Sequence, residues 1–231
     1  NLGSDRESGT TGKCLFMVTP DAERTMNTYL GITSDLHARH INEEAIASSD
    51  YVYIEGYLVT GDTSRAAAIQ VRELARKHGV KVAMTCSDPA MVQYFRSGIL
   101  EILGDGVDLL FCNEQEAQLL TETTTLDAAI EALKATAHAF AVTCGKDGAL
   151  AWDGEQLHRI TPHSVTAVDT NGAGDMFAGA FLYALTHGHD FAAAGRLAAA
   201  ASAQVVSQFG PRLDASQHEP LKATLKQQQP S

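Results

Sequence analysis

A heptad with two glycines lies in the C-terminal third of the chain: Asp169-Thr170-Asn171-Gly172-Ala173-Gly174-Asp175. Apolar residues follow it at helical spacing from Phe177 to Leu185, and Gly188 can end that helix. Glycines at a helix start let backbone N–H groups converge on an anion, which the helix dipole also favours. An aspartate in that first turn can accept a proton from an attacking hydroxyl during phosphoryl transfer. The heptad predicts an anion pocket with an acid beside it; alternatively, Asp175 only complements the helix dipole.

Strand-like and helix-like segments alternate upstream of the heptad. Apolar runs predict strands at 15–19, 24–30, 51–54, 80–85, 107–111 and 140–143. Helical patterns lie between the later strands, at 65–78 with Ser64 as its cap, from Pro89, through Glu116 and Leu120, and at about 126–137. Asp153-Gly154 predicts a hairpin between strands at 148–152 and 156–160. This alternation indicates an α/β fold with a mostly parallel sheet covered on both faces, and ligands beyond the carboxyl ends of its strands.

Composition narrows the class of protein. The 231 residues are 45% hydrophobic and 19% charged, with a net charge of −11, which argues against a nucleic-acid partner. No apolar run approaches the ~18 residues of a membrane span, and no signal peptide is visible, so we expect no membrane partner. The four cysteines form no Cys-x-x-Cys pair, and we expect buried thiols in a reducing cytoplasm. The first residue is Asn1, which indicates either that sequence precedes it or that the terminus is processed or tagged.

Three further segments follow predicted strands or helices. Asn113-Glu114-Gln115-Glu116 offers an amide and a carboxylate, oxygen ligands that suit Mg²⁺, or it is an ordinary helix cap. The loop 143–148 holds Thr143, Gly145 and Gly148, which suit a backbone lying close to a nucleotide, or a simple hairpin turn. Lys146 in that loop is either a phosphate contact or a solvated surface charge, and we favour the surface charge. The segment 205–211 is the end of an apolar helix followed by Gly210-Pro211. It is either part of a ligand site or simply a helix end, and both interpretations explain the residues equally well.

Together these four elements resemble the ribokinase-like, or PfkB, family of carbohydrate and nucleoside kinases, from about Gly12 to Leu213. The resemblance implies a three-layer α/β/α fold with a mostly parallel central sheet and a small β lid. It implies that residues 1–34 form part of the lid and its connection, with the N-terminal portion absent. Residues 35–231 would form the nucleotide-binding and catalytic core.

The resemblance also assigns roles to single residues. Asp175 would be the catalytic base, and Gly172, Ala173 and Gly174 the anion hole. Asn113, Glu116, Thr143, Gly145 and Gly148 would bind ATP, with Glu116 organising Mg²⁺ through water. Backbone carbonyls of the 205–211 segment, together with residues of the heptad, would bind K⁺. The residues of this predicted cation site are Asp169, Asn171, Val205, Gln208 and Gly210. Gln208 stands where some family members carry a basic residue, which leaves this cation site open.

The expected activity is ATP-dependent phosphorylation of a hydroxymethyl group on a small nucleoside or sugar. The segments 18–31, 55–58 and 208–212 look like the bacterial adenosine-kinase-like branch, which favours adenosine. A ribokinase- or fructokinase-type sugar kinase is the first alternative, and a catalytically silent nucleotide-binding module is the second. The resemblance further suggests a homodimer formed through the β lid.

Overall fold

The computed structural model describes residues 8–19 and 24–226. The sequence Thr19-Pro20-Asp21-Ala22 also predicts a turn, of which the last three residues lie outside this part of the chain. The strands are β1 Lys13–Val18, β2 Arg24–Tyr29, β3 Tyr51–Glu55, β4 Lys81–Thr85, β5 Val107–Asn113, β6 Ala137–Thr143, β7 Ala149–Trp152 and β8 Leu157–Ile160. The α-helices are α1 Glu43–Ala47, α2 Asp62–Lys77, α3 Pro89–Leu103, α4 Glu114–Thr121, α5 Leu126–Leu133, α6 Ala173–Thr186, α7 Phe191–Val206 and α8 Ala215–Lys226.

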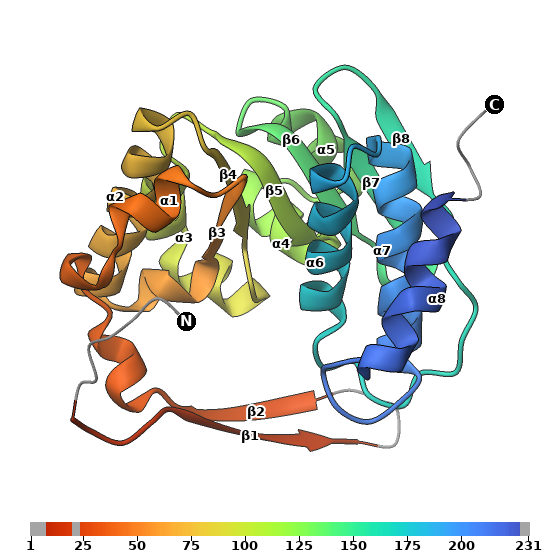
Figure 1. Ribbon diagram of the computed structural model, residues 1–231, viewed down its shortest axis with the longest axis horizontal. Coiled ribbons are helices and arrows are strands. Elements are labelled where there is room, and N and C mark those ends of the chain that lie inside the picture. The colour runs from red at the N-terminus through yellow and green to blue at the C-terminus, as the bar shows by residue number, and fades with distance from the viewer. Residues whose placement is uncertain (1–7, 20–23, 227–231) are drawn as a thin grey trace. The chain divides into compact units, whose positions relative to one another are not determined.

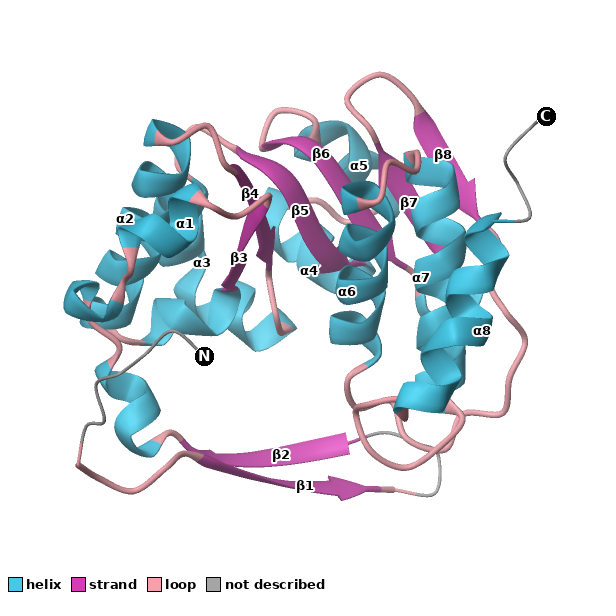
Figure 2. Cartoon of the chain, viewed as in Figure 1, coloured by secondary structure: helices cyan, strands magenta, loops and turns pink. Residues whose placement is uncertain are grey.

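The expected three-layer α/β architecture is confirmed. Six strands form a mostly parallel sheet in the order β3-β4-β5-β6-β7-β8, with helices around it (Figure 1). β1 and β2 form a separate two-stranded sheet, which Figure 2 shows in magenta. The chain divides into two compact units, and each is described by itself below. The first comprises residues 1–15 and 27–140, and the second residues 16–26 and 141–231.

The first unit is built on three parallel strands. β3 pairs with β4 from Tyr51↔Lys81 to Glu55↔Thr85, and β4 pairs with β5 from Ala83↔Leu109 to Thr85↔Phe111. Side chains alternate between the two faces of a strand. On one face Ile54, Met84 and Leu110 are almost fully enclosed, which gives the unit its hydrophobic core. This packing brings the carboxyl ends of all three strands to one edge.

The second unit is built on a hairpin and a helix pair. β7 and β8 are antiparallel, with Asp153-Gly154 in the turn between them as predicted. Asp153 Oδ1 accepts hydrogen bonds from the backbone N–H groups of Glu155 and Gln156, which closes that turn. α6 packs along α7, with Phe181 fully buried and Phe191 against its ring. Asp190 caps α7 by accepting from Ala193 N at 2.7 Å.

Three sequence-based expectations need correction. α2 begins at Asp62 rather than at Arg65, and Ser64 lies in its first turn, where its hydroxyl donates to the carbonyls of Leu58 and Gly61 instead of capping. α5 ends at Leu133 rather than at about residue 137, because Ala137 is already the first residue of the largely buried strand β6. Cys86 and Cys112 are buried as expected, but Cys144 is half-buried and Cys14 is exposed on the two-stranded sheet.

In the described part of the chain, no helix combines the length and apolar character that crossing a membrane would require.

Candidate active site

The heptad lies at the start of α6, in the second unit. Gly172 is the N-cap residue and has a left-handed backbone (φ 77°, ψ 3°), which favours glycine. A Cβ atom at this position would lie 2.6 Å from the carbonyl oxygen and Cβ of Pro211, so the space is also closed to a side chain. The residue therefore has to be glycine for two independent reasons.

The N-terminus of α6 has no side-chain cap. Ser, Thr, Asp and Asn side chains are the preferred partners of the first N–H groups of a helix. Here a glycine takes that position. Ala173 N donates to Thr170 O at 3.3 Å, and the N–H groups that follow it in the first turn can face an anion, whose charge the helix dipole stabilises. A Cβ atom at Gly174 would meet no atom within 4 Å, which shows open space beside these groups. Asp175 is exposed in the same turn.

Asp169 ties the heptad to the loop after α7. Its side chain is buried, with the residue 1% exposed. Oδ1 accepts from Asn171 N at 2.9 Å, and Oδ2 accepts from Gly210 N at 3.0 Å. The N–H groups of Val168 and Asp169 both donate to Val206 O. One carboxylate thus fixes two segments that lie 41 residues apart.

Replacing Asp169 with asparagine is expected to lower the free energy of unfolding by about 1–3 kcal/mol. The amide has one acceptor oxygen, so its NH₂ group would face a buried backbone N–H. Urea unfolding of the wild type and of the Asp169→Asn variant measures this difference in the free energy of unfolding. Asp214→Asn, an exposed acid next to the same loop, should change it by only about 0.5 kcal/mol. Equal effects from the two variants would contradict the role given to Asp169.

The segment predicted to bind a monovalent cation is partly assembled by these contacts. Asp169, Asn171 and Gly210 come together through the carboxylate of Asp169. Val205 lies in the last turn of α7, and its carbonyl accepts from Gln208 N. The Gln208 side chain donates to Arg212 O and accepts from Gln217, so it is held within its own loop. K⁺ binding itself stays a prediction.

The predicted nucleotide loop follows β6 as a tight turn. Gly145 and Gly148 both have positive φ, at 55° and 91°. Cys144 N donates to Gly148 O at 2.8 Å, and Asp147 N donates to Cys144 O, so the turn closes on its own backbone. Thr143 ends β6 just before it and is half-buried. Gly145 is exposed with open space beside it, whereas a Cβ atom at Gly148 would meet Ile160 O and Pro162.

Asn113 and Glu116 form a capping box at the start of α4, in the first unit. Glu116 N donates to Asn113 Oδ1 at 2.8 Å, and Asn113 N donates to Glu116 Oε2 at 2.8 Å. Asn113 Nδ2 also donates to Glu116 Oε1 at 3.0 Å. Both carboxylate oxygens therefore already accept hydrogen bonds. The helix-cap interpretation is thus correct for these residues.

Glu116 is a carboxyl group in an unusual electrostatic setting. Its side chain is buried, with the residue 4% exposed. Burial raises its pKa, the hydrogen bond from Asn113 N opposes this change, and the negative charge of Asp88 adds to it, which brings the pKa to about 7. A cation nearby would reverse that balance and favour the carboxylate.

Sequence reasoning missed Asp88 near Glu116 and the contact of Pro211 with Gly172. Asp88 caps α3 by accepting from Ala90 N, and an aspartate directly before Pro89 was the signal that could have found it. Pro211 belongs to the predicted segment 205–211, but its contact with Gly172 depends on a segment distant in the chain.

Comparison with known proteins places these elements in one family. The model of the pfkB family of carbohydrate kinases matches residues 4–218. A probable sugar kinase from Rhizobium etli is 34% identical, with a TM-score of 0.88, and an adenosine kinase from Sinorhizobium meliloti is 35% identical, with a TM-score of 0.87. The alignments cover 93% and 94% of this chain and 66% of each structure.

A ribokinase from Lactococcus lactis is 32% identical over 160 residues, which are 67% of this chain and 52% of the relative. The chain thus spans between about half and two thirds of the length of these relatives. The match to the family model extends over nearly all of the described residues, including the heptad and the capping box. The chain therefore belongs to the pfkB family of carbohydrate kinases.

Proposed function

We propose that the protein is an ATP-dependent phosphotransferase that moves the γ-phosphate of ATP to a hydroxymethyl group of a nucleoside or sugar. The observation that carries the proposal is the start of α6, where uncapped N–H groups, a left-handed Gly172 and an exposed Asp175 occur in one turn. This combination supplies both an anion cradle and a proton acceptor. Membership of a carbohydrate kinase family supports the same conclusion.

In the proposed reaction Asp175 accepts the proton of the acceptor hydroxyl as its oxygen attacks the γ-phosphorus. The bond from that phosphorus to the β-bridging oxygen breaks, and ADP leaves with the electron pair. The N–H groups at Gly172–Gly174 would stabilise negative charge on the transferring group, at a site where the backbone is fixed beforehand. Asp169 keeps that backbone in place through Asn171 and Gly210.

The donor set at Asn113 and Glu116 fits a Mg²⁺ ion bound through water. Both oxygens of Glu116 already accept hydrogen bonds from Asn113, which favours contact with a hydrated ion over direct ligation. When bound, Mg²⁺ would neutralise charge on the phosphates of ATP. We include Thr143, Gly145 and Gly148 in the proposed nucleotide site because Gly145, at the tip of their turn, is exposed with open space beside it.

Adenosine is the acceptor that we favour. The relative from Sinorhizobium meliloti named adenosine kinase is 35% identical and aligns with 94% of this chain. The ribokinase from Lactococcus lactis supports a sugar as the alternative.

Acceptor-dependent release of ADP from the full-length protein tests the proposal. The panel should contain adenosine, other nucleosides, ribose and fructose, each with ATP and Mg²⁺. We expect turnover with adenosine above that with the sugars. Turnover with fructose or ribose alone would correct the acceptor, and ATP binding without transfer to any acceptor would overturn the kinase proposal.

A further inference from the structure

The turn between β4 and α3 has an unusual backbone at Ser87. Its φ is 71°, in the left-handed region that side chains other than glycine rarely adopt. Asp88 N donates to Cys86 O at 2.9 Å, which closes a γ-turn around Ser87. A γ-turn whose central residue has positive φ is rare and strained. Glycine would adopt this backbone without the cost of a Cβ atom.

The side chain of Ser87 is also unusual. Its hydroxyl oxygen is fully enclosed, and it is the one such side-chain oxygen or nitrogen without a hydrogen-bond partner in the described ranges. An enclosed polar atom without a partner costs free energy, so most proteins pair such atoms. Alanine would remove this cost. Ser87 therefore combines two unfavourable features, and such combinations concentrate at functional sites.

The position of the turn connects it to the capping box of Asn113 and Glu116. β4 and β5 are parallel neighbours with Thr85 opposite Phe111, and Cys86 N continues the pairing by donating to Phe111 O at 3.0 Å. Ser87 therefore follows β4 at the same edge at which Asn113 ends β5. The charge of Asp88, the next residue, acts on Glu116, which places the turn close to that carboxyl group.

We propose that Ser87 is a positioning residue for the kinase reaction, whose hydroxyl hydrogen-bonds to the water shell of a Mg²⁺ ion held at Asn113 and Glu116. This inference rests on the proposed function. The hydroxyl is enclosed in the free protein, so the half-buried side chain has to turn about its Cα–Cβ bond to reach the water shell, while the turn keeps the backbone in place. The enclosed oxygen then gains a partner in the bound state that it lacks in the free protein.

Two measurements on the full-length protein test this role. The first is the urea midpoint of Ser87→Ala without nucleotide or metal. We expect a midpoint at or above that of the wild type, because the variant loses an unpaired hydroxyl. The second is the Mg²⁺ concentration that gives half-maximal binding of β,γ-methylene ATP. We expect an increase of about tenfold, the usual effect of removing an outer-shell partner of a metal ion.

Ser64→Ala is the matched control. The Ser64 hydroxyl is buried in the same unit but donates to the carbonyls of Leu58 and Gly61. Its removal should lower the urea midpoint and leave the Mg²⁺ requirement unchanged. The two serines should thus show opposite patterns.

The outcomes separate this inference from the proposed function. A wild-type protein that binds the nucleotide with Mg²⁺, together with a Ser87→Ala variant of unchanged Mg²⁺ requirement, overturns the role of Ser87 alone. A lowered urea midpoint with an unchanged Mg²⁺ requirement does the same and makes the hydroxyl structural. A wild-type protein without Mg²⁺-dependent nucleotide binding overturns both proposals.

Discussion

Replacing Asp175 with asparagine is expected to lower kcat at least ~10²-fold, the lower end of what a general base contributes. Asparagine keeps the size and one oxygen of the side chain but cannot accept the proton of the acceptor hydroxyl. The N–H groups of the first turn of α6 remain, so the KM for ATP should change by only a few-fold. Steady-state ADP release across a range of ATP concentrations separates the two constants.

Asp190→Asn is the matched control for this prediction. Asp190 is also an acid at a helix start in the second unit, but there its carboxylate caps α7 through Ala193 N. Asparagine is an equally good capping residue, so stability and kcat should both be retained. If Asp175→Asn behaves like Asp190→Asn, Asp175 only complements the helix dipole, and the base has to be sought elsewhere.

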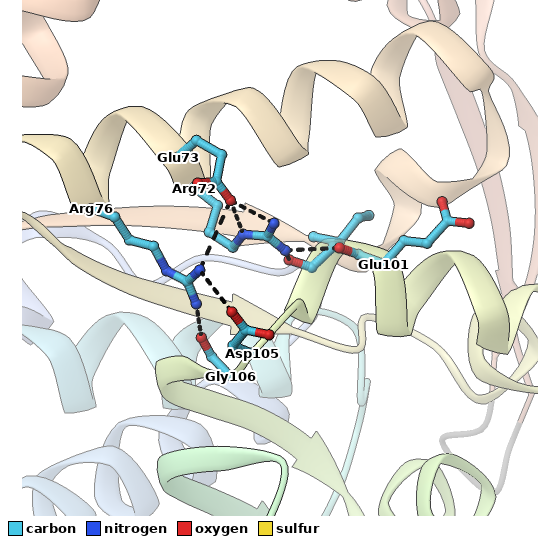
Figure 3. Close-up of polar contacts among 7 residues, drawn as sticks. Arg72, Glu73, Arg76, Glu101, Asp105 and Gly106 are labelled. Atoms are coloured by element: carbon cyan, nitrogen blue, oxygen red, sulfur yellow. Dashed lines mark hydrogen bonds and ion pairs between the residues drawn. The ribbon is translucent and has the colours of Figure 1, made fainter.

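Replacing Arg72 with methionine is expected to lower the free energy of unfolding by about 2–4 kcal/mol. Arg72 is 7% exposed, and its Nη1 donates to the carbonyls of Glu101 and Ile102 at 2.8 and 2.6 Å. These carbonyls lie in the last turn of α3, where a helix lacks its own N–H partners. Figure 3 shows the guanidinium between Glu73 and this turn. Methionine preserves packing but leaves both carbonyls without their charged donor.

Arg76→Met provides the comparison on the same helix. Arg76 donates to Gly106 O at 2.8 Å, but its side chain is 37% exposed, and its ion pairs with Glu73 and Asp105 are 3.9 and 4.0 Å long. Water can replace these contacts, so we expect a loss of about 1 kcal/mol or less. Urea unfolding of both variants measures the difference. Equal losses of unfolding free energy in the two variants would contradict the larger contribution that we expect from the buried Arg72.

Much of the local structure was predictable because its determinants lie within a few residues of each other. Apolar runs marked β3 to β6, the Asp153-Gly154 turn fixed the hairpin, and the apolar spacing from Phe177 to Leu185 marked α6. The error at Ser64 arose because a serine near a helix start looks like a cap, whereas packing gave its hydroxyl the carbonyl of Leu58. The error at the end of α5 had a similar origin, since Ala137 suits a helix equally well.

The division into a lid at residues 1–34 and a core at 35–231 stays a prediction, as does a dimer formed through the lid. The two-stranded sheet of β1 and β2 has large apolar side chains at its surface, with Leu15 66% and Tyr29 59% exposed. Such exposed apolar side chains are what the predicted dimer contact would cover.

The sequence alone predicted an anion pocket with an acid at residues 169–175, because the helix start, its glycines and the acid are neighbours along the chain. It also determined the family, since four such local elements occur in order. Only the tertiary structure revealed that Asp169 joins Asn171 to Gly210, that Pro211 requires glycine at 172, and that Ser87 has an enclosed hydroxyl without a partner. The physical reason is that the partner of a buried polar group comes from whichever distant segment packs against it, and no local pattern encodes that choice.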